Sequence, residues 1–266
     1  MWPLIKVTVR QRLVSIISWS VGLAAFVWLE LGVYSSVNSQ AQQLNHVFNK
    51  LPGTFRSLFG AQDVFSPAGW MNSHLYYLLV PLMFSCISIG LGSSLIAREE
   101  SDGTLELLLS RPISRGKLIA SKAFAGLVIF GIIAAVTAAS SALIVKGIHY
   151  PMAVRRVAFA TLLSALLALL LGAIAFCTTA FGRWGRGASM ALAALIGLGG
   201  YIVGSLEGSV HWLTWPAKFF PYHYYNTSGV LYGYYSYMVA GVFAAVALVL
   251  IIISWLAFRR RDLTGS

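Results

Sequence analysis

The sequence predicts an all-α protein that crosses a membrane six times. Of its 266 residues, 58% are hydrophobic and 10% are charged, whereas soluble domains carry roughly a quarter charged residues. Strict alternation of polar and apolar residues is missing, which argues against a β-barrel. An apolar run of about 20 residues spans the hydrocarbon core as a helix, because lipid offers the backbone no hydrogen-bond partner. Six such runs occur, at about 13–33, 75–97, 123–145, 157–181, 188–206 and 236–257.

The Lys and Arg residues indicate how these spans are oriented. With the N-terminus placed in the cytoplasm, the cytoplasmic connections receive 13 of the 19 basic residues and the outer connections receive six. Such an excess is typical of inner loops, so both termini are predicted to be cytoplasmic. The outer group consists of Lys50, Arg56, Lys146, Arg155, Arg156 and Lys218, and the three bases at 146–156 run against the pattern.

This distribution also explains the overall charge. The net charge of +11 follows from orientation in the membrane and does not indicate a nucleic-acid partner. We expect residues 1–266 to form a single transmembrane domain in the cell membrane, surrounded by the lipid bilayer.

Two outer connections carry a pattern of their own. Leu44, Val47, Phe48 and Leu51 recur with helical spacing before Pro52-Gly53, which predicts a short interfacial helix. The connection at about 207–235 is rich in Trp and Tyr and is interrupted by two prolines. Such a segment is either an aromatic belt at the headgroup level or a re-entrant lid over an exit path, and the sequence leaves both readings open.

Small residues line one face of the fifth span. Closely spaced small residues let two helices approach in lipid, where packing replaces the hydrophobic effect as the force that joins them. The sequence does not decide whether this face meets another helix of the same chain or a second subunit. The stripe consists of Ser189, Ala193, Gly197, Gly200, Gly204 and Gly208.

Two residues inside the spans are unusual. Glu30 is the only acid within a span and lies in the outer third of the first one, where it either reaches the interface or faces a transport path. Pro81 lies in the second span and has no N–H to donate. It should therefore bend that helix and release the carbonyl group of Tyr77.

The most informative segment is the hydrophilic connection 97–122 between the second and third spans. It holds four of the chain's eight acids and five of its 19 bases. A cluster of capping residues at 101–104, followed by Leu105, Leu108 and Leu109 on one face, predicts a short amphipathic helix at about 99–112 that Pro112 ends. Leu107 stands on the opposite face between charges, as an apolar anchor for a partner would.

The sequence of 98–115, REESDGTLELLLSRPISR, resembles the cytoplasmic loop of ABC-2 type transporter permeases. Its arrangement is similar to the E-x-x-x-GT-x-E-x-LLS-x-P-x-SR form found in the NosY-like and antibiotic-exporter branches. The pattern Leu-Pro-Gly at 51–53 with Leu-Phe-Gly at 58–60, and the six-span layout with a long first outer loop, extend the resemblance over nearly the whole chain. Only the loop motif is specific.

This resemblance implies a permease subunit of an ATP-driven exporter. Two permeases would pair, as a homodimer or a heterodimer, and each would dock one of two cytoplasmic ABC ATPase subunits through the helix between spans two and three. ATP and Mg²⁺ would bind to that ATPase, and this chain would bind no cofactor. The implied docking residues are Glu99, Glu100, Gly103, Thr104, Glu106, Leu107 and Arg111.

In such permeases the substrate passes between the two subunits, lined mainly by spans one, two and five. The candidates for that lining, or for the subunit interface, are Glu30, Gly197, Gly200, Gly204 and Gly208. The outer aromatics suit a lipid, a peptide or a drug-like amphiphile, and the sequence does not identify the substrate.

Other classes of protein fit the motifs less well. Gly116-Lys117 lacks the remaining residues of a phosphate-binding loop. No HExxH or GxSxG motif indicates a membrane-embedded enzyme, and the scattered His and Cys residues predict no metal site. An ion-driven secondary transporter stays open as the main alternative, although such carriers often show internal repeats and charges near mid-membrane.

Overall fold

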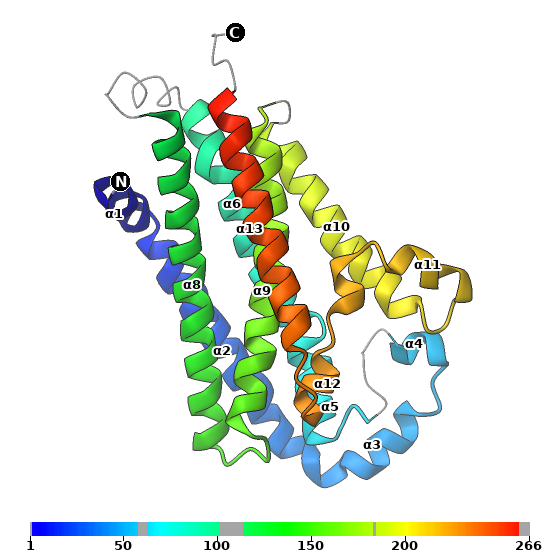
Figure 1. Ribbon diagram of the computed structural model, residues 1–266. Coiled ribbons are helices and arrows are strands. Elements are labelled where there is room, and N and C mark those ends of the chain that lie inside the picture. The colour runs from blue at the N-terminus through cyan, green and yellow to red at the C-terminus, as the bar shows by residue number, and fades with distance from the viewer. Residues whose placement is uncertain (1, 58–62, 102–113, 183–184, 261–266) are drawn as a thin grey trace.

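The computed structural model describes residues 2–57, 63–101, 114–182 and 185–260. Within these ranges the chain is helical and contains no strand. Six helical segments are long and apolar enough to cross a membrane, which confirms the predicted fold class (Figure 1). These segments are Leu13–Tyr34, Pro67–Ala97, Arg115–Gly147, Val154–Ala180, Arg186–Leu206 and Tyr237–Arg260.

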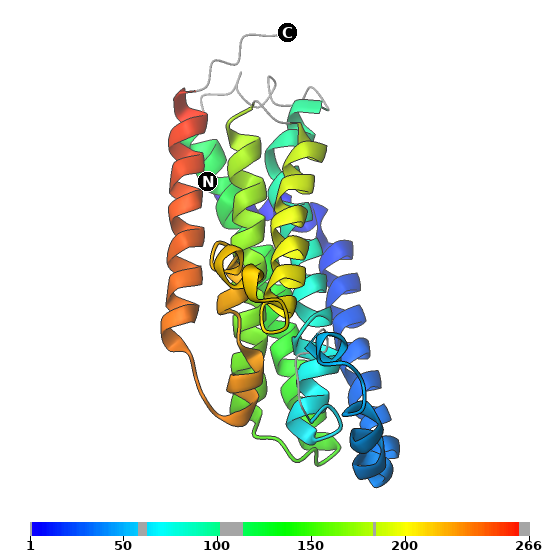
Figure 2. The same ribbon diagram turned by 90° about the vertical axis from the view of Figure 1, so that its right-hand side faces the viewer.

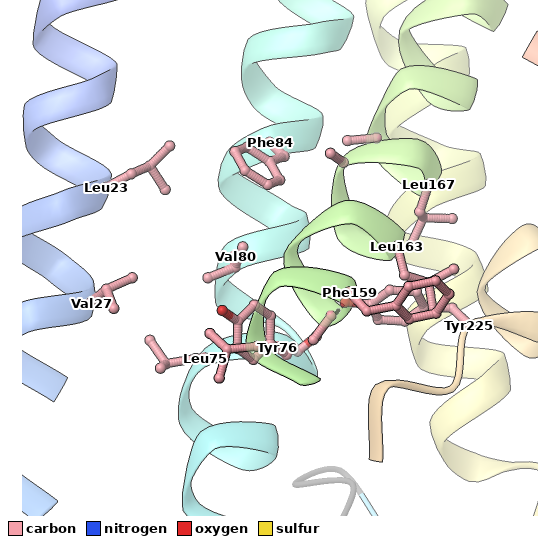
Figure 3. Close-up of a cluster of buried hydrophobic side chains, with 14 of the residues drawn as sticks. Leu23, Val27, Leu75, Tyr76, Val80, Phe84, Phe159, Leu163, Leu167 and Tyr225 are labelled. Carbon is pink, nitrogen blue, oxygen red and sulfur yellow. Dashed lines mark hydrogen bonds between the residues drawn. The ribbon is translucent and has the colours of Figure 1, made fainter. Parts of the chain in front are cut away.

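Helix α9 (Val154–Ala180) forms the centre of the bundle. It packs against α6 (Leu79–Ser101), α8 (Arg115–Gly147), α10 (Arg186–Leu206) and α13 (Tyr237–Arg260). The main core extends from α2 (Leu13–Val37) through α6 and α8 to α9, and Phe84 of α6 and Leu163 of α9 are fully buried in it (Figure 3). The helices around α9 expose their other faces, as expected of spans that contact lipid.

Helices α6 and α9 approach each other closely at two glycines. A Cβ placed on Gly92 would lie 2.2 Å from the carbonyl oxygen of Gly172, and one on Gly172 would lie 2.0 Å from Ser88 Oγ. Glycine at both positions therefore lets the two backbones touch, which is the main source of helix attraction in lipid.

The N-terminus forms a helix that the sequence reading did not separate from the first span. Helix α1 (Trp2–Gln11) is separated from α2 by a single residue, Arg12. It lies against α8 at an angle to the bundle (Figure 1). It buries Ile5 and Thr8 and exposes Trp2 and Val7. Ten residues of mixed polarity are too short and too polar for a span, so the segment lies along the bundle end.

One end of the bundle collects most of the described basic residues. Helix α1, the start of α8, the start of α10 and the end of α13 share this end (Figure 1). The basic residues there are Lys6, Arg10, Arg12, Arg115, Lys117, Lys122, Arg186, Arg259 and Arg260. We call it the inner end, following the predicted orientation, which itself stays a prediction.

The first outer connection forms two short helices. The 3₁₀ turn η1 (Asn38–Gln40) and α3 (Ala41–Phe48) continue from α2, and α4 (Gly53–Ser57) follows after Pro52. Helix α3 covers most of the predicted amphipathic stretch but ends at Phe48, before Leu51. Together these helices project sideways from the bundle (Figure 1), toward the viewer in Figure 2.

Candidate functional site

The second span is interrupted near its outer end. It begins with α5 (Pro67–Trp70), whose N-terminus is capped by Ser66 Oγ accepting from the Gly69 N–H at 3.0 Å. A π-helical turn, η2 (Met71–Tyr76), follows, and the Tyr77 N–H donates to the carbonyl of Asn72 at 2.7 Å. The helical segment of the second span thus starts at residue 67 and not at the predicted residue 75. The difference arises because α5 and the π-helical turn extend the helix toward the outer side, beyond the apolar run.

Pro81 releases the carbonyl of Tyr77, and that oxygen is bound by a distant side chain. The hydroxyl of Tyr222 donates to it. Nearby, the hydroxyl of Tyr225 donates to the carbonyl of Tyr76 at 2.5 Å. Two tyrosines from the connection between α10 and α13 therefore donate hydrogen bonds to the carbonyl groups at the interruption of the second span. Carbonyl groups that are shielded from water need such a donor.

That connection, residues 207–236, folds back against the bundle through η4 and α12, and we call it the re-entrant segment. It contains η3 (His211–Leu213), α11 (Thr214–Ala217), η4 (Pro221–Tyr224) and α12 (Thr227–Tyr232). Tyr222 and Tyr225 are buried, and Tyr225 lies beside the core residues of α9 (Figure 3). Burial raises the pKa of both phenols, which keeps them protonated as donors.

Six further aromatic residues of the connection are exposed, as expected of an interfacial belt. They are Trp212, Trp215, Phe219, Tyr224, Tyr232 and Tyr234. Within one segment, Tyr222, Val230 and Leu231 thus enter the core while other rings stay exposed. Whether the segment acts as an interfacial belt or as a lid stays a prediction.

Three tyrosines from three elements meet at the interruption. The ring centroids of Tyr77 and Tyr201 lie 5.8 Å apart, those of Tyr77 and Tyr222 5.9 Å, and those of Tyr201 and Tyr222 5.4 Å. All three pairs are edge-on, an arrangement that aromatic quadrupoles favour. We call this group the tyrosine cluster.

An apolar groove of about 110 Å³ lies on one side of the tyrosine cluster. It runs between α6, α9 and α10 and includes Leu82, Cys86, Gly197 and Leu198, with Tyr201 and Tyr222 at one end. Ser85 is its polar exception, and that hydroxyl donates to the carbonyl of Pro81 at 2.6 Å. A ligand in the groove would therefore make contacts with hydrocarbon side chains and few hydrogen bonds.

An open polar cavity of about 760 Å³ lies on the outer side. Its wall includes Tyr77, and the Tyr77 hydroxyl contacts Ser205 Oγ at 2.8 Å and the Ser57 carbonyl at 3.1 Å. Arg56, Asp63 and Glu207 add charges of both signs. The Nε–H of Arg56 has no hydrogen-bond partner in the described part of the chain.

A side-chain hydrogen bond fixes the re-entrant segment beside this cavity. Glu207 follows α10 directly, and its Oε2 lies 2.7 Å from Nδ1 of His223 in η4. Both side chains are about three-quarters covered, at 25% and 23% exposure. The pair thus holds η4 against the end of α10.

The predicted small-residue stripe packs within the chain. A Cβ on Gly197 would lie 2.9 Å from Leu171 of α9, and one on Gly200 or Gly204 would lie 3.1 Å or 3.2 Å from the side chains of Phe220 or Tyr222. Gly208 has open space around it. The stripe therefore seats the re-entrant segment, and a contact with a second subunit stays a prediction.

The remaining predicted residues fall elsewhere. The Glu30 carbonyl accepts from Trp70 Nε1 at 3.1 Å, and Glu30 borders neither the groove nor the outer cavity. Glu99 and Glu100 lie in the last turns of α6. Gly103, Thr104, Glu106, Leu107 and Arg111 lie outside the described residues. Among the described residues, no group of three His, Cys, Asp or Glu side chains is placed to hold a metal ion.

These features are those of a multi-pass membrane protein that encloses space for a small molecule. The chain matches the family model described as "ABC-2 family transporter protein" over residues 2–263, so it belongs to the ABC-2 transporter family. No curated protein matches it significantly. The family resemblance read from the loop motif is confirmed, whereas its NosY-like branch stays a prediction. The protein is a transporter permease of the cell membrane.

Proposed function

We infer that this permease is the membrane subunit of an ATP-driven exporter and docks a separate cytoplasmic ATPase through the connection between α6 and α8. The loop motif of 98–115 supports this most directly, because its sequence predicts a charged amphipathic segment with a leucine on the polar face, which suits a protein partner. A second permease, identical or different, would complete the complex, and ATP with Mg²⁺ would bind on the ATPase.

The helices that flank the docking connection are tied to the rest of the inner end. Trp255 Nε1 of α13 donates to the carbonyl of Gly116 at 3.1 Å, and the Arg259 guanidinium lies 4.4 Å from the Trp255 ring centroid. Arg12, just after α1, donates to Ser94 Oγ of α6 at 2.9 Å. A force applied to the connection would therefore move α6, α8 and α13 together.

A compact apolar cluster reinforces this inner end. It joins α6, α8, α9 and α13 through Ile96, Ile119, Phe176 and Phe258, all of them buried. The second span, in contrast, is interrupted at its outer end. Movement of the joined inner end about the interruption in the second span would give the two packing states that alternating access requires.

The test is recovery of the tagged chain from its native membranes, followed by mass spectrometry of what co-purifies. A stoichiometric ATPase with phosphate-binding loop motifs is expected with the wild type and is expected to be lost with Leu107→Arg. Gln43→Arg, an exposed change at the opposite end, serves as the matched control and should retain the ATPase. Recovery of the chain alone, with transport that survives ATP depletion, would contradict the proposal and favour an ion-driven carrier.

A further inference from the structure

The tyrosine cluster separates two spaces of opposite chemistry. The groove at Leu82, Gly197 and Leu198 is apolar, and the outer cavity at Arg56 and Glu207 is polar. Tyr201 and Tyr222 border the groove, and Tyr77, in edge contact with both rings, borders the cavity. A molecule that passed from one space to the other would have to displace these rings.

The groove opens beside exposed apolar residues of α10, a surface that we expect to contact lipid. Leu198, part of its wall, is 47% exposed, and Leu195 and Ile202 on the same helix are 70% and 52% exposed. Apolar residues exposed on a span are normal where the solvent is lipid. A hydrocarbon chain dissolved in the bilayer therefore meets no polar barrier at the mouth of the groove.

The residues that line the groove and the outer cavity indicate which kind of ligand would fit. Within the groove, the hydroxyls of Ser85 and Tyr222 donate to backbone carbonyls, so these two groups do not offer a donor to a ligand. The outer cavity has hydroxyl groups and charges of both signs at Arg56, Asp63 and Glu207. Pockets of this kind bind molecules whose apolar and polar parts match the two regions.

We propose that the groove binds the aliphatic chain of a single-chain amphiphile with a zwitterionic or neutral polar head, and that the tyrosine cluster is the gate between the groove and the outer cavity. The proposal rests on the transport function inferred above and adds the substrate class and the gate. Tyr222 closes the gate because its hydroxyl donates to the Tyr77 carbonyl that Pro81 leaves free.

The binding step is tested with purified permease in phosphatidylcholine vesicles, without an ATPase, so that its outcome is independent of the docking experiment. The probe is a lysophosphatidylcholine with a diazirine on its acyl chain, and cross-linked peptides are mapped by mass spectrometry. Labelling of residues 78–89 and 194–201 is expected, and Leu198→Trp should lower it by about tenfold by filling the groove.

Leu195→Trp is the matched control, since Leu195 lies one turn away on the same helix and does not border the groove. It should leave the labelling unchanged. An equal loss in both variants would overturn the site. Equal labelling by the diacyl form of the probe would also overturn it, because the groove would then hold only surrounding lipid.

The gate is tested through Cys86, an exposed thiol in the groove, with Cys177 buried and replaced by alanine. A charged, membrane-impermeant methanethiosulfonate is added to the outer side. In the wild type Cys86 should react slowly. Tyr222→Phe should raise the rate by about tenfold, because losing the hydroxyl bond to Tyr77 loosens the barrier while the ring remains.

Tyr224→Phe is the control for the gate, since this exposed tyrosine in the same segment loses only a bond to the Lys218 carbonyl. Its rate should equal that of the wild type. The gate would be overturned by fast reaction in the wild type or by equal rates in Tyr222→Phe and Tyr224→Phe. A thermal unfolding scan of each variant confirms that the rates refer to folded protein.

Discussion

The hydroxyl of Tyr222 donates to the carbonyl oxygen of Tyr77, the group that Pro81 leaves without an intrahelical partner. The two residues are 145 positions apart in the chain and belong to different outer elements. The bond joins the interruption in the second span to the re-entrant segment. It makes the conformation of α6 dependent on the position of η4.

Tyr222→Phe should destabilise the protein by about 1 kcal/mol, because the part-buried Tyr77 carbonyl loses a side-chain donor while the ring contacts remain. The measurement is reversible unfolding in mixed micelles, followed by circular dichroism. Tyr224→Phe should have a much smaller effect, since its hydroxyl is exposed. Equal destabilisation by both changes would show that the buried bond contributes nothing specific.

A double-mutant cycle isolates the role of Pro81. In a Pro81→Ala background, the new N–H can donate to the Tyr77 carbonyl, so Tyr222→Phe should then cost less than it does in the wild type. A difference of about 0.5 kcal/mol or more between the two backgrounds is expected. Identical costs would mean that the tyrosine does not compensate for the proline.

Gly92→Ala should be among the most destabilising single-methyl changes in the spans. Its Cβ would lie 2.2 Å from a backbone oxygen of α9, which has no rotamer to change, so the helices must separate. Overpacking of this kind costs about 1–3 kcal/mol. Gly90→Ala, two residues earlier in α6, meets nothing within 4 Å and should be neutral or stabilising. Similar unfolding midpoints for the two variants would contradict the observed crossing.

Much of the fold follows from local sequence, because a span is a property of about 20 consecutive residues. The release of the Tyr77 carbonyl is equally local, since it depends on a proline four positions later. Its donor, Tyr222, could not be predicted, because many aromatic residues in 207–235 are equivalent by composition. Pro221 next to Tyr222 was the only local signal, and it indicates a turn and not a partner.

Helix α1 and the close approach of Gly92 to Gly172 were missed for related reasons. The apolar face of α1 is short, and Lys6 and Arg10 read equally well as flanking charges of the first span. Glycines are common in spans, so the pair at the crossing does not stand out, whereas the longer stripe at 189–208 does. The sequence left open whether that stripe meets the same chain or a second subunit, and it did not indicate the neighbours seen here, Leu171 of α9 and Phe220 of the following connection.

Gly204→Leu should disturb the seat of the re-entrant segment. The larger side chain would press on Tyr222, whose ring carbon lies 3.2 Å from the position of a Cβ. A lower unfolding midpoint is expected, with the mass of the complex in detergent unchanged. Gly208→Leu, four residues later in open space, should leave the midpoint as in the wild type. If Gly204→Leu instead lowered the mass and kept the midpoint, the stripe would be a subunit interface.

Cysteine accessibility tests the orientation of the two bundle ends with a matched pair of glutamines. In a background without native cysteines, Gln43→Cys in α3 and Gln11→Cys at the end of α1 each place an exposed thiol outside the apolar spans. An impermeant maleimide added to intact cells should label position 43 and not position 11, because the basic residues gather at the end that carries α1. After the cells are permeabilised, both positions should react. Labelling of position 11 in intact cells would reverse the topology and place the connection between α6 and α8 on the wrong side for a cytoplasmic ATPase.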